Sequence, residues 1–118
     1  MENPLPPCPD SPNCVRTTRV HPDDPEIVWE AAVAAIDRMQ PAEKETYPDE
    51  YRLEAVFQVF FFKDDLVVRL EASGDGESPE TGTYLHIRSS SRVGYSDLGV
   101  NRRRVKTFFG LLERVRGF

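Results

Sequence analysis

The chain has 118 residues, a length that suits one domain with a single core. Hydrophobic residues make up 39% and charged residues 30%, which is typical of a soluble globular protein, and apolar runs such as residues 59–62 are far too short to cross a bilayer. The net charge of −5 argues against a general nucleic-acid binder, because the long-range field repels polyanions.

Residues 1–22 contain six prolines, a density that disfavours a helix or a central strand because each proline removes a backbone donor. We therefore expect a Pro-rich extended arm, followed by a single domain over residues 23–118. The first twenty residues lack the basic start and apolar stretch of a secretory signal. This favours a cytoplasmic location, or a soluble piece excised from a longer protein.

Two cysteines, Cys8 and Cys14, enclose a turn-rich Pro-Asp-Ser-Pro-Asn loop that can bring their sulfurs together. In an oxidising compartment we expect a disulfide, and in the cytosol two free thiols. A zinc site is a weaker alternative, because two more ligands are needed and only His21 lies near.

Residues 23–26, Asp-Asp-Pro-Glu, have the features of a helix start, with an aspartate cap and a proline in the first turn. Apolar residues then recur at spacings of three and four, which predicts a helix to Gln40 with one face on a sheet. These residues are Trp29, Ala32, Val33, Ile36 and Met39. We expect Trp29 to be a core residue rather than a ligand platform.

From Glu45 onward the apolar period changes to two, which predicts an antiparallel sheet. About four strands are expected, at residues 44–47, 51–61, 66–72 and 83–90. Lys63-Asp64-Asp65 is predicted to turn the chain. Phe60, Phe61 and Phe62 place aromatic rings on both faces of a strand, which is unusual where one face is wet. The predicted fold is α+β, with an N-terminal and a C-terminal helix on one face of the sheet.

Six charged or titratable residues are expected to share the outer face of this sheet: Arg52, Glu54, Arg69, Glu71, His86 and Arg88. Cross-strand charge pairs are the simplest account of them. His86 is a weak catalytic candidate, because a general base also needs an orienting partner and a cleft.

Polar residues crowd the junction between the last strand and the C-terminal helix. Eight of the fifteen basic residues lie from Arg88 onward, against only Asp97 and Glu113. A helix capped there has free N–H groups that can bind an anion, although the Asp97 carboxylate competes. The alternative is a solvated helix face that complements the helix dipole. The ligand-binding or anion-binding candidates are Arg88, Ser89, Ser91, Arg92, Tyr95, Ser96, Asn101 and Arg102.

Asn101 is the only polar member of a helix seam that otherwise holds Leu98, Val105, Phe108, Leu112 and Val115. It should therefore face the protein and find hydrogen-bond partners there. The expected partners are backbone groups of residues 92–95, which gives Asn101 a structural role.

Three segments carry a resemblance to a known family. They are Cys8-Pro-Asp-Ser-Pro-Asn-Cys-Val15, Phe62-Lys-Asp-Asp65 and Ser91-Arg-Val-Gly-Tyr-Ser-Asp-Leu-Gly-Val-Asn-Arg-Arg-Arg-Val105. The chain resembles the domain-of-unknown-function family 1499 over nearly its whole length, and departs from it at Arg16-Thr17, where the family tends to have serines. Family members often carry an N-terminal membrane or export segment. The family has no established activity, so the resemblance implies motif positions and no reaction.

Three functions are open. The favoured one is a non-catalytic ligand-binding or partner-binding module with its site at residues 88–104, whose partner is a small anion or a protein. The others are a structural accessory domain of a larger assembly, and a divalent-metal enzyme using Asp64, Asp65 and Asp97. We expect no cofactor, since no nucleophile elbow, phosphate loop, HExxH or CxxC motif occurs.

Overall fold

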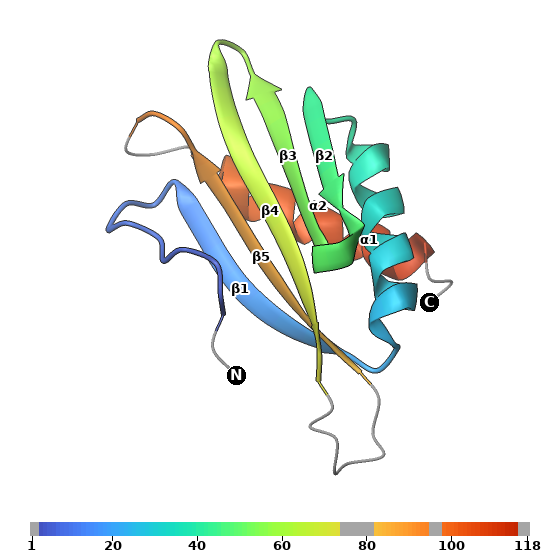
Figure 1. Ribbon diagram of the computed structural model, residues 1–118. Helices are drawn as coiled ribbons and strands as arrows, with labels where there is room; N and C mark the ends of the chain where they lie inside the picture. The colour runs from blue at the N-terminus through green and yellow to red at the C-terminus, as the bar shows by residue number, and fades with distance from the viewer. Residues whose placement is uncertain (1–2, 74–81, 95–97, 116–118) are drawn as a thin grey trace.

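A computed structural model of the protein describes residues 3–73, 82–94 and 98–115. In this part of the chain the elements are β1 (Cys14–His21), α1 (Pro25–Met39), β2 (Glu43–Tyr47), the short 3₁₀ helix η1 (Pro48–Glu50), β3 (Arg52–Val59), β4 (Phe62–Ala72), β5 (Thr83–Ser91) and α2 (Val100–Val115). The strands form one antiparallel sheet in the order β1-β5-β4-β3-β2, and both helices lie on the same side of it (Figure 1). The α+β prediction is confirmed.

The sheet has five described strands, so the expectation of about four was too low. The additional strand is β1, which lies inside the segment predicted to be an extended arm. The prolines of that segment flank β1 at Pro12 and Pro22 and leave a proline-free stretch rich in valine and threonine, residues that favour strands. The non-strand arm is therefore limited to the residues before Cys14.

The helix α1 follows its predicted course. It begins at Pro25 and ends at Met39, and Gln40 then adopts a left-handed conformation with a φ of 55°. Asp24 occupies the cap position, but its side chain makes no capping hydrogen bond. The buried face of α1 consists of Val28, Ala31, Ala32, Ala35 and Ile36. Trp29 is partly buried against this core, as expected of a core residue.

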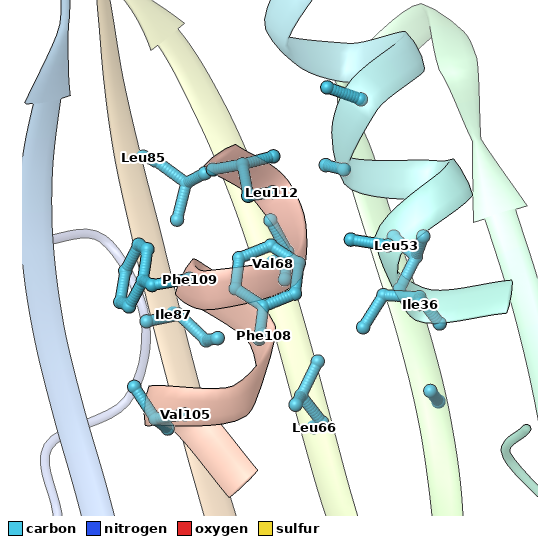
Figure 2. Close-up of a cluster of buried hydrophobic side chains, with 14 of the residues drawn as sticks. Ile36, Leu53, Leu66, Val68, Leu85, Ile87, Val105, Phe108, Phe109 and Leu112 are labelled. Atoms are coloured by element: carbon cyan, nitrogen blue, oxygen red, sulfur yellow. The ribbon is translucent and has the colours of Figure 1, made fainter. Parts of the chain in front are cut away.

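The core fills the space between the sheet and the two helices (Figure 2). The sheet contributes alternate residues of its three central strands: Leu53, Ala55, Phe57, Leu66, Val68, Leu70, Leu85 and Ile87. From α2 come Phe108 and Phe109, whose rings meet edge to face with centroids 5.4 Å apart. Because one continuous core includes residues of both helices, the prediction that they share one face of the sheet is confirmed.

The opposite side of the sheet carries the predicted outer-face residues. Arg69 lies between Arg52 of β3 and His86 of β5 in register, and Glu71 and Arg88 share its side of the pleat.

No helix in the described part of the chain is both long and apolar enough to span a bilayer.

The predicted turn at residues 63–65 is wrong. Val59 pairs with Phe62, so the two-residue loop of the β3–β4 hairpin is Phe60-Phe61. Asp64 and Asp65 lie inside β4 and point to opposite faces of the sheet. Polar residues mark turns because turns are usually solvated, and here each aspartate instead has an arginine partner within the fold.

Candidate functional site

A network of polar side chains is buried between the start of α2 and the sheet. Arg104 Nη1 donates to Asp64 Oδ2 at 2.8 Å and to Asn101 Oδ1 at 2.8 Å, and lies 3.3 Å from Ser89 Oγ. The side chains of Arg104 and Asp64 are only 7% and 4% exposed. This ion pair is therefore almost fully desolvated, and each charge depends on the other.

Asn101 is fully buried and lies at the centre of this network. Its Oδ1 accepts from Ser89 Oγ at 2.6 Å, and its Nδ2 donates to Ser91 Oγ at 2.9 Å and to the backbone oxygen of Asn13 at 3.1 Å. The prediction that Asn101 faces the protein is confirmed. None of these three partners lies in residues 92–95, where we expected them; they come from β5 and from the N-terminal arm.

Asn13, like Arg104, is a member of the network that the sequence did not single out. Its side chain is buried and donates to the backbone oxygen of Gly94 at 2.6 Å, while its backbone oxygen accepts from the Ser91 N–H at 3.0 Å. The arm is thereby joined to the junction across some eighty residues of sequence. Its position in the loop between Cys8 and Cys14 was the only feature of the sequence that could have marked Asn13 as part of the network.

The arm is held against β1 and β5 by arginines and a disulfide. Arg88 Nε donates to the Pro6 oxygen at 2.9 Å, and Arg16 donates to backbone oxygens of Asn3 and Leu5. A disulfide joins Cys8 and Cys14, whose Cα atoms are 5.7 Å apart. Of the three alternatives for the cysteines, the structure has the disulfide. Arg88, a predicted ligand-binding residue, donates to the arm through Nε and Nη2 and to Ser90 Oγ of β5 through Nη1.

Arg92 forms a two-pronged ion pair with Asp65 on the helix-free face. The Nε–Oδ2 and Nη2–Oδ1 distances are 3.0 and 2.9 Å, and both side chains remain nearly half exposed. The hydrogen bond to Asp65 raises the pKa of Arg92. Asp64 and Asp65 thus lie on opposite faces of β4, in separate ion pairs, which is unfavourable for joint coordination of one metal ion.

The remaining predicted site residues divide into two groups. Arg102 is exposed on the first turn of α2. Tyr95, Ser96 and Asp97 lie outside the described residues.

His86 is fully buried although it lies on the helix-free face. Its Nδ1 is 2.8 Å from Thr18 Oγ1, which in turn accepts from Asn3 of the arm. Its Nε2 lies 3.4 Å from Glu71 Oε1 and makes no hydrogen bond to the described residues. Burial lowers the pKa of His86, with Arg69 and Arg16 acting in the same direction and Glu71 opposing them.

This shift predicts that the protein is destabilised by mild acid. The folded-state pKa of His86 lies below the unfolded value of 6.5, so the unfolded chain takes up a proton first as the pH falls. The contribution of His86 to stability is fully present above pH 6.5 and decreases as the pH falls below that value. The free energy of unfolding, measured with urea at several pH values, should fall more steeply with decreasing pH for the parent than for His86→Gln. An equal dependence on pH in the two proteins would contradict this assignment.

A groove of about 330 Å³ lies between the C-terminal end of α1 and the first turns of α2. Its lining residues are Arg38, Met39, Phe57, Val100, Arg103, Arg104, Thr107 and Leu111. The buried network forms one wall of the groove, because its member Arg104 lines the groove together with Phe57. The Arg104 guanidinium carbon lies 4.8 Å from the centroid of the Phe57 ring. Sequence reasoning missed the contribution of α1, since Arg38 carries no local signal of a site.

A second hollow of about 370 Å³ lies on the other face of the sheet. Its lining mixes Glu43, Glu45, Glu54 and Asp65 with Lys44 and Arg92. Arg92 is already paired with Asp65 there. The groove beside α2 is therefore the better candidate for an anionic ligand.

A family model described as "Protein of unknown function (DUF1499)" matches residues 4–112. The chain belongs to this family. No curated protein and no solved structure matches the chain. The DUF1499 match includes the arm from Pro4, all five strands and α2 as far as Leu112. The buried network and the groove both lie within it.

Proposed function

We propose that the protein is a non-catalytic binding module whose site is the groove along the first turns of α2, and whose ligand is a small amphipathic anion. The observation that carries this proposal is the composition of the groove. Three arginines line it together with apolar side chains, and none of its described lining residues is acidic. A pocket of this size suits a small molecule.

The positive charge of the groove comes mainly from Arg38 and Arg103. The charge of Arg104 is neutralised by Asp64, so Arg104 contributes to the wall of the groove without adding positive charge. Arg103 donates to the backbone oxygen of Leu98, and no acidic side chain among the described residues pairs with it. Within residues 3–73, 82–94 and 98–115, Arg38 has no ion-pair partner. Two uncompensated cations at one groove favour an anionic head group.

The apolar part of the groove comes from Met39, Phe57 and Leu111. Phe57 belongs to the core, and Leu111 packs at its edge. Contact with these side chains removes apolar ligand surface from water. A ligand with a short hydrocarbon chain or an aromatic ring next to a carboxylate or phosphate therefore fits both parts of the groove.

Calorimetric titration with decyl phosphate, compared with uncharged decanol, tests this proposal. The parent should bind decyl phosphate more tightly than decanol, and R38E/R103E should weaken the binding of decyl phosphate by about tenfold or more. The matched control is R69E, which reverses an exposed charge on the opposite face. Equal binding of both probes by the parent, or unchanged binding by R38E/R103E, would contradict an anion site here.

The other two functions remain alternatives. A structural accessory domain is supported by the buried network, because Ser89, Ser91 and Asn101 direct their polar atoms to one another. A metal-dependent enzyme is less favoured, because Asp64 and Asp65 point apart. A protein partner and the lack of general nucleic-acid binding stay predictions. A cytoplasmic location also stays a prediction, and the disulfide favours an oxidising compartment instead.

A further inference from the structure

The hairpin between β3 and β4 ends in three aromatic side chains that point into solvent. Phe60, Phe61 and Phe62 are 86%, 96% and 53% exposed, and we call them the aromatic tip. Single exposed apolar residues are ordinary on protein surfaces, but three consecutive phenylalanines form a patch of the kind that marks an interaction site. None of the three belongs to the described core.

The residue type at the start of the aromatic tip also departs from what a stable hairpin prefers. Phe60 has a φ of 56°, in the left-handed region. Two-residue hairpin loops normally place glycine, asparagine or aspartate at such a position, because a bulky side chain is strained there. Neither the local turn nor the core benefits from phenylalanine at this place, which points to a role outside the fold.

Further apolar and basic side chains lie at the same end of the sheet. The Arg92 N–H donates to the Lys63 oxygen at 3.0 Å, which places the start of the β5–α2 loop beside the hairpin. Val93, next along this loop, is 58% exposed. Lys63 and Arg92 are also partly exposed there, each beside an acidic partner, Glu43 and Asp65 respectively. Figure 1 shows that the β3–β4 hairpin extends beyond the ends of the other strands.

We propose that the aromatic tip inserts into the surface of a lipid bilayer that contains anionic lipids. Phe61 is exposed on nearly all sides, and a fluid medium can close around such a side chain, whereas a protein surface covers mainly one side of it. Aromatic rings suit the boundary between head groups and acyl chains. The exposed arginines at the start of α2, Arg102 and Arg103, attract anionic head groups. This contact is peripheral and needs no membrane-spanning segment.

The charge distribution supports the same orientation. The chain as a whole is acidic, with a net charge of −5, but its basic residues concentrate from Arg88 onward. Arg102 and Arg103 are exposed at the start of α2, which follows the β5–α2 loop. An anionic membrane therefore attracts this end of the protein and repels the acidic remainder, so that the tip approaches first.

Co-flotation with vesicles tests the proposal, using phosphatidylcholine mixed with phosphatidylglycerol and phosphatidylcholine alone. The parent should float with the mixed vesicles and less with the uncharged ones. F61S should partition about tenfold or more weakly, because it loses the burial of one aromatic side chain. I27S is the matched control, since Ile27 is 51% exposed on α1, and should float like the parent. A parent that stays in solution, or an F61S variant that floats equally well, would overturn the proposal.

A second variant reports on insertion itself. In F61W the emission of the new tryptophan should shift to shorter wavelength on addition of mixed vesicles, and brominated lipids should quench it. An unshifted spectrum would mean that the tip stays in water, against the proposal. The proposal also fails if sedimentation shows a dimer of the parent without vesicles that F61S converts to monomer, because the occupant is then a second copy of the chain. Neither readout depends on Arg38, so failure here leaves the groove proposal untouched.

Discussion

Asp64→Asn is expected to lower the free energy of unfolding by about 3 to 5 kcal/mol, because it leaves the Arg104 guanidinium charged, buried and without its counterion. The loss should appear as a lower urea midpoint with an unchanged dependence on denaturant. Asp65→Asn is the matched control. It breaks the two-pronged ion pair with Arg92 one residue away, on the solvent-exposed face, and should have a much smaller effect.

A double variant separates the cost of an unpaired charge from the value of the pair. Asp64→Leu combined with Arg104→Met removes both charges and fills a similar volume, so it should recover much of the stability that Asp64→Asn loses. If Asp64→Asn unfolds at the same urea concentration as the parent, Arg104 is not the buried partner described above.

Asn101→Ala is expected to cost about 1 to 3 kcal/mol, because it leaves the buried Ser89 Oγ and the partly buried Ser91 Oγ without the amide between them. Arg102→Ala, at the next position but on the exposed side of α2, should change stability by less than about 0.5 kcal/mol. Urea unfolding of both variants measures the difference. Should the two behave alike, Asn101 does not hold the arm, β5 and α2 together.

Elements with a strong apolar period were predictable from the sequence. The three- and four-residue spacing around Ile36 and the seam through Phe108 gave the two helices, and the alternation around Leu53 and Val68 gave the central strands. The seam also showed that Asn101 must face inward. Each of these signals is local, because burial of one face repeats within a few residues.

β1 could not be found in this way because it is an edge strand with a mixed inner face. Of its residues that point towards the helices, Arg19 is exposed and covers the ring of Phe109 with its guanidinium, 3.8 Å from the ring centroid. Because an arginine covers the aromatic ring at this position, the sequence of β1 lacks the alternation of apolar and polar residues that would have predicted a strand.

The groove and the buried network depend on contacts between distant segments. Asp64 and Arg104 are forty residues apart, and Arg38 and Arg103 are further apart still. Asp64 has the composition of a turn residue, and only its position beneath α2 shows that it is a buried counterion. Sequence reasoning therefore found the junction as a region but not the partners that its residues have.

The position of β1 beside β5 sets the order in which the sheet can be completed. The strands from β2 to β5 are each paired with the next in sequence, so their contacts are local. Every residue of β1, in contrast, pairs with a residue more than sixty positions further along the chain. In a chain synthesised from its N-terminus, β1 therefore has no strand to pair with until β5, the last strand of the sheet, has been made. Closure of this long loop adds entropic cost late in folding, and until then the edge of β1 and the arm before it stay exposed to solvent.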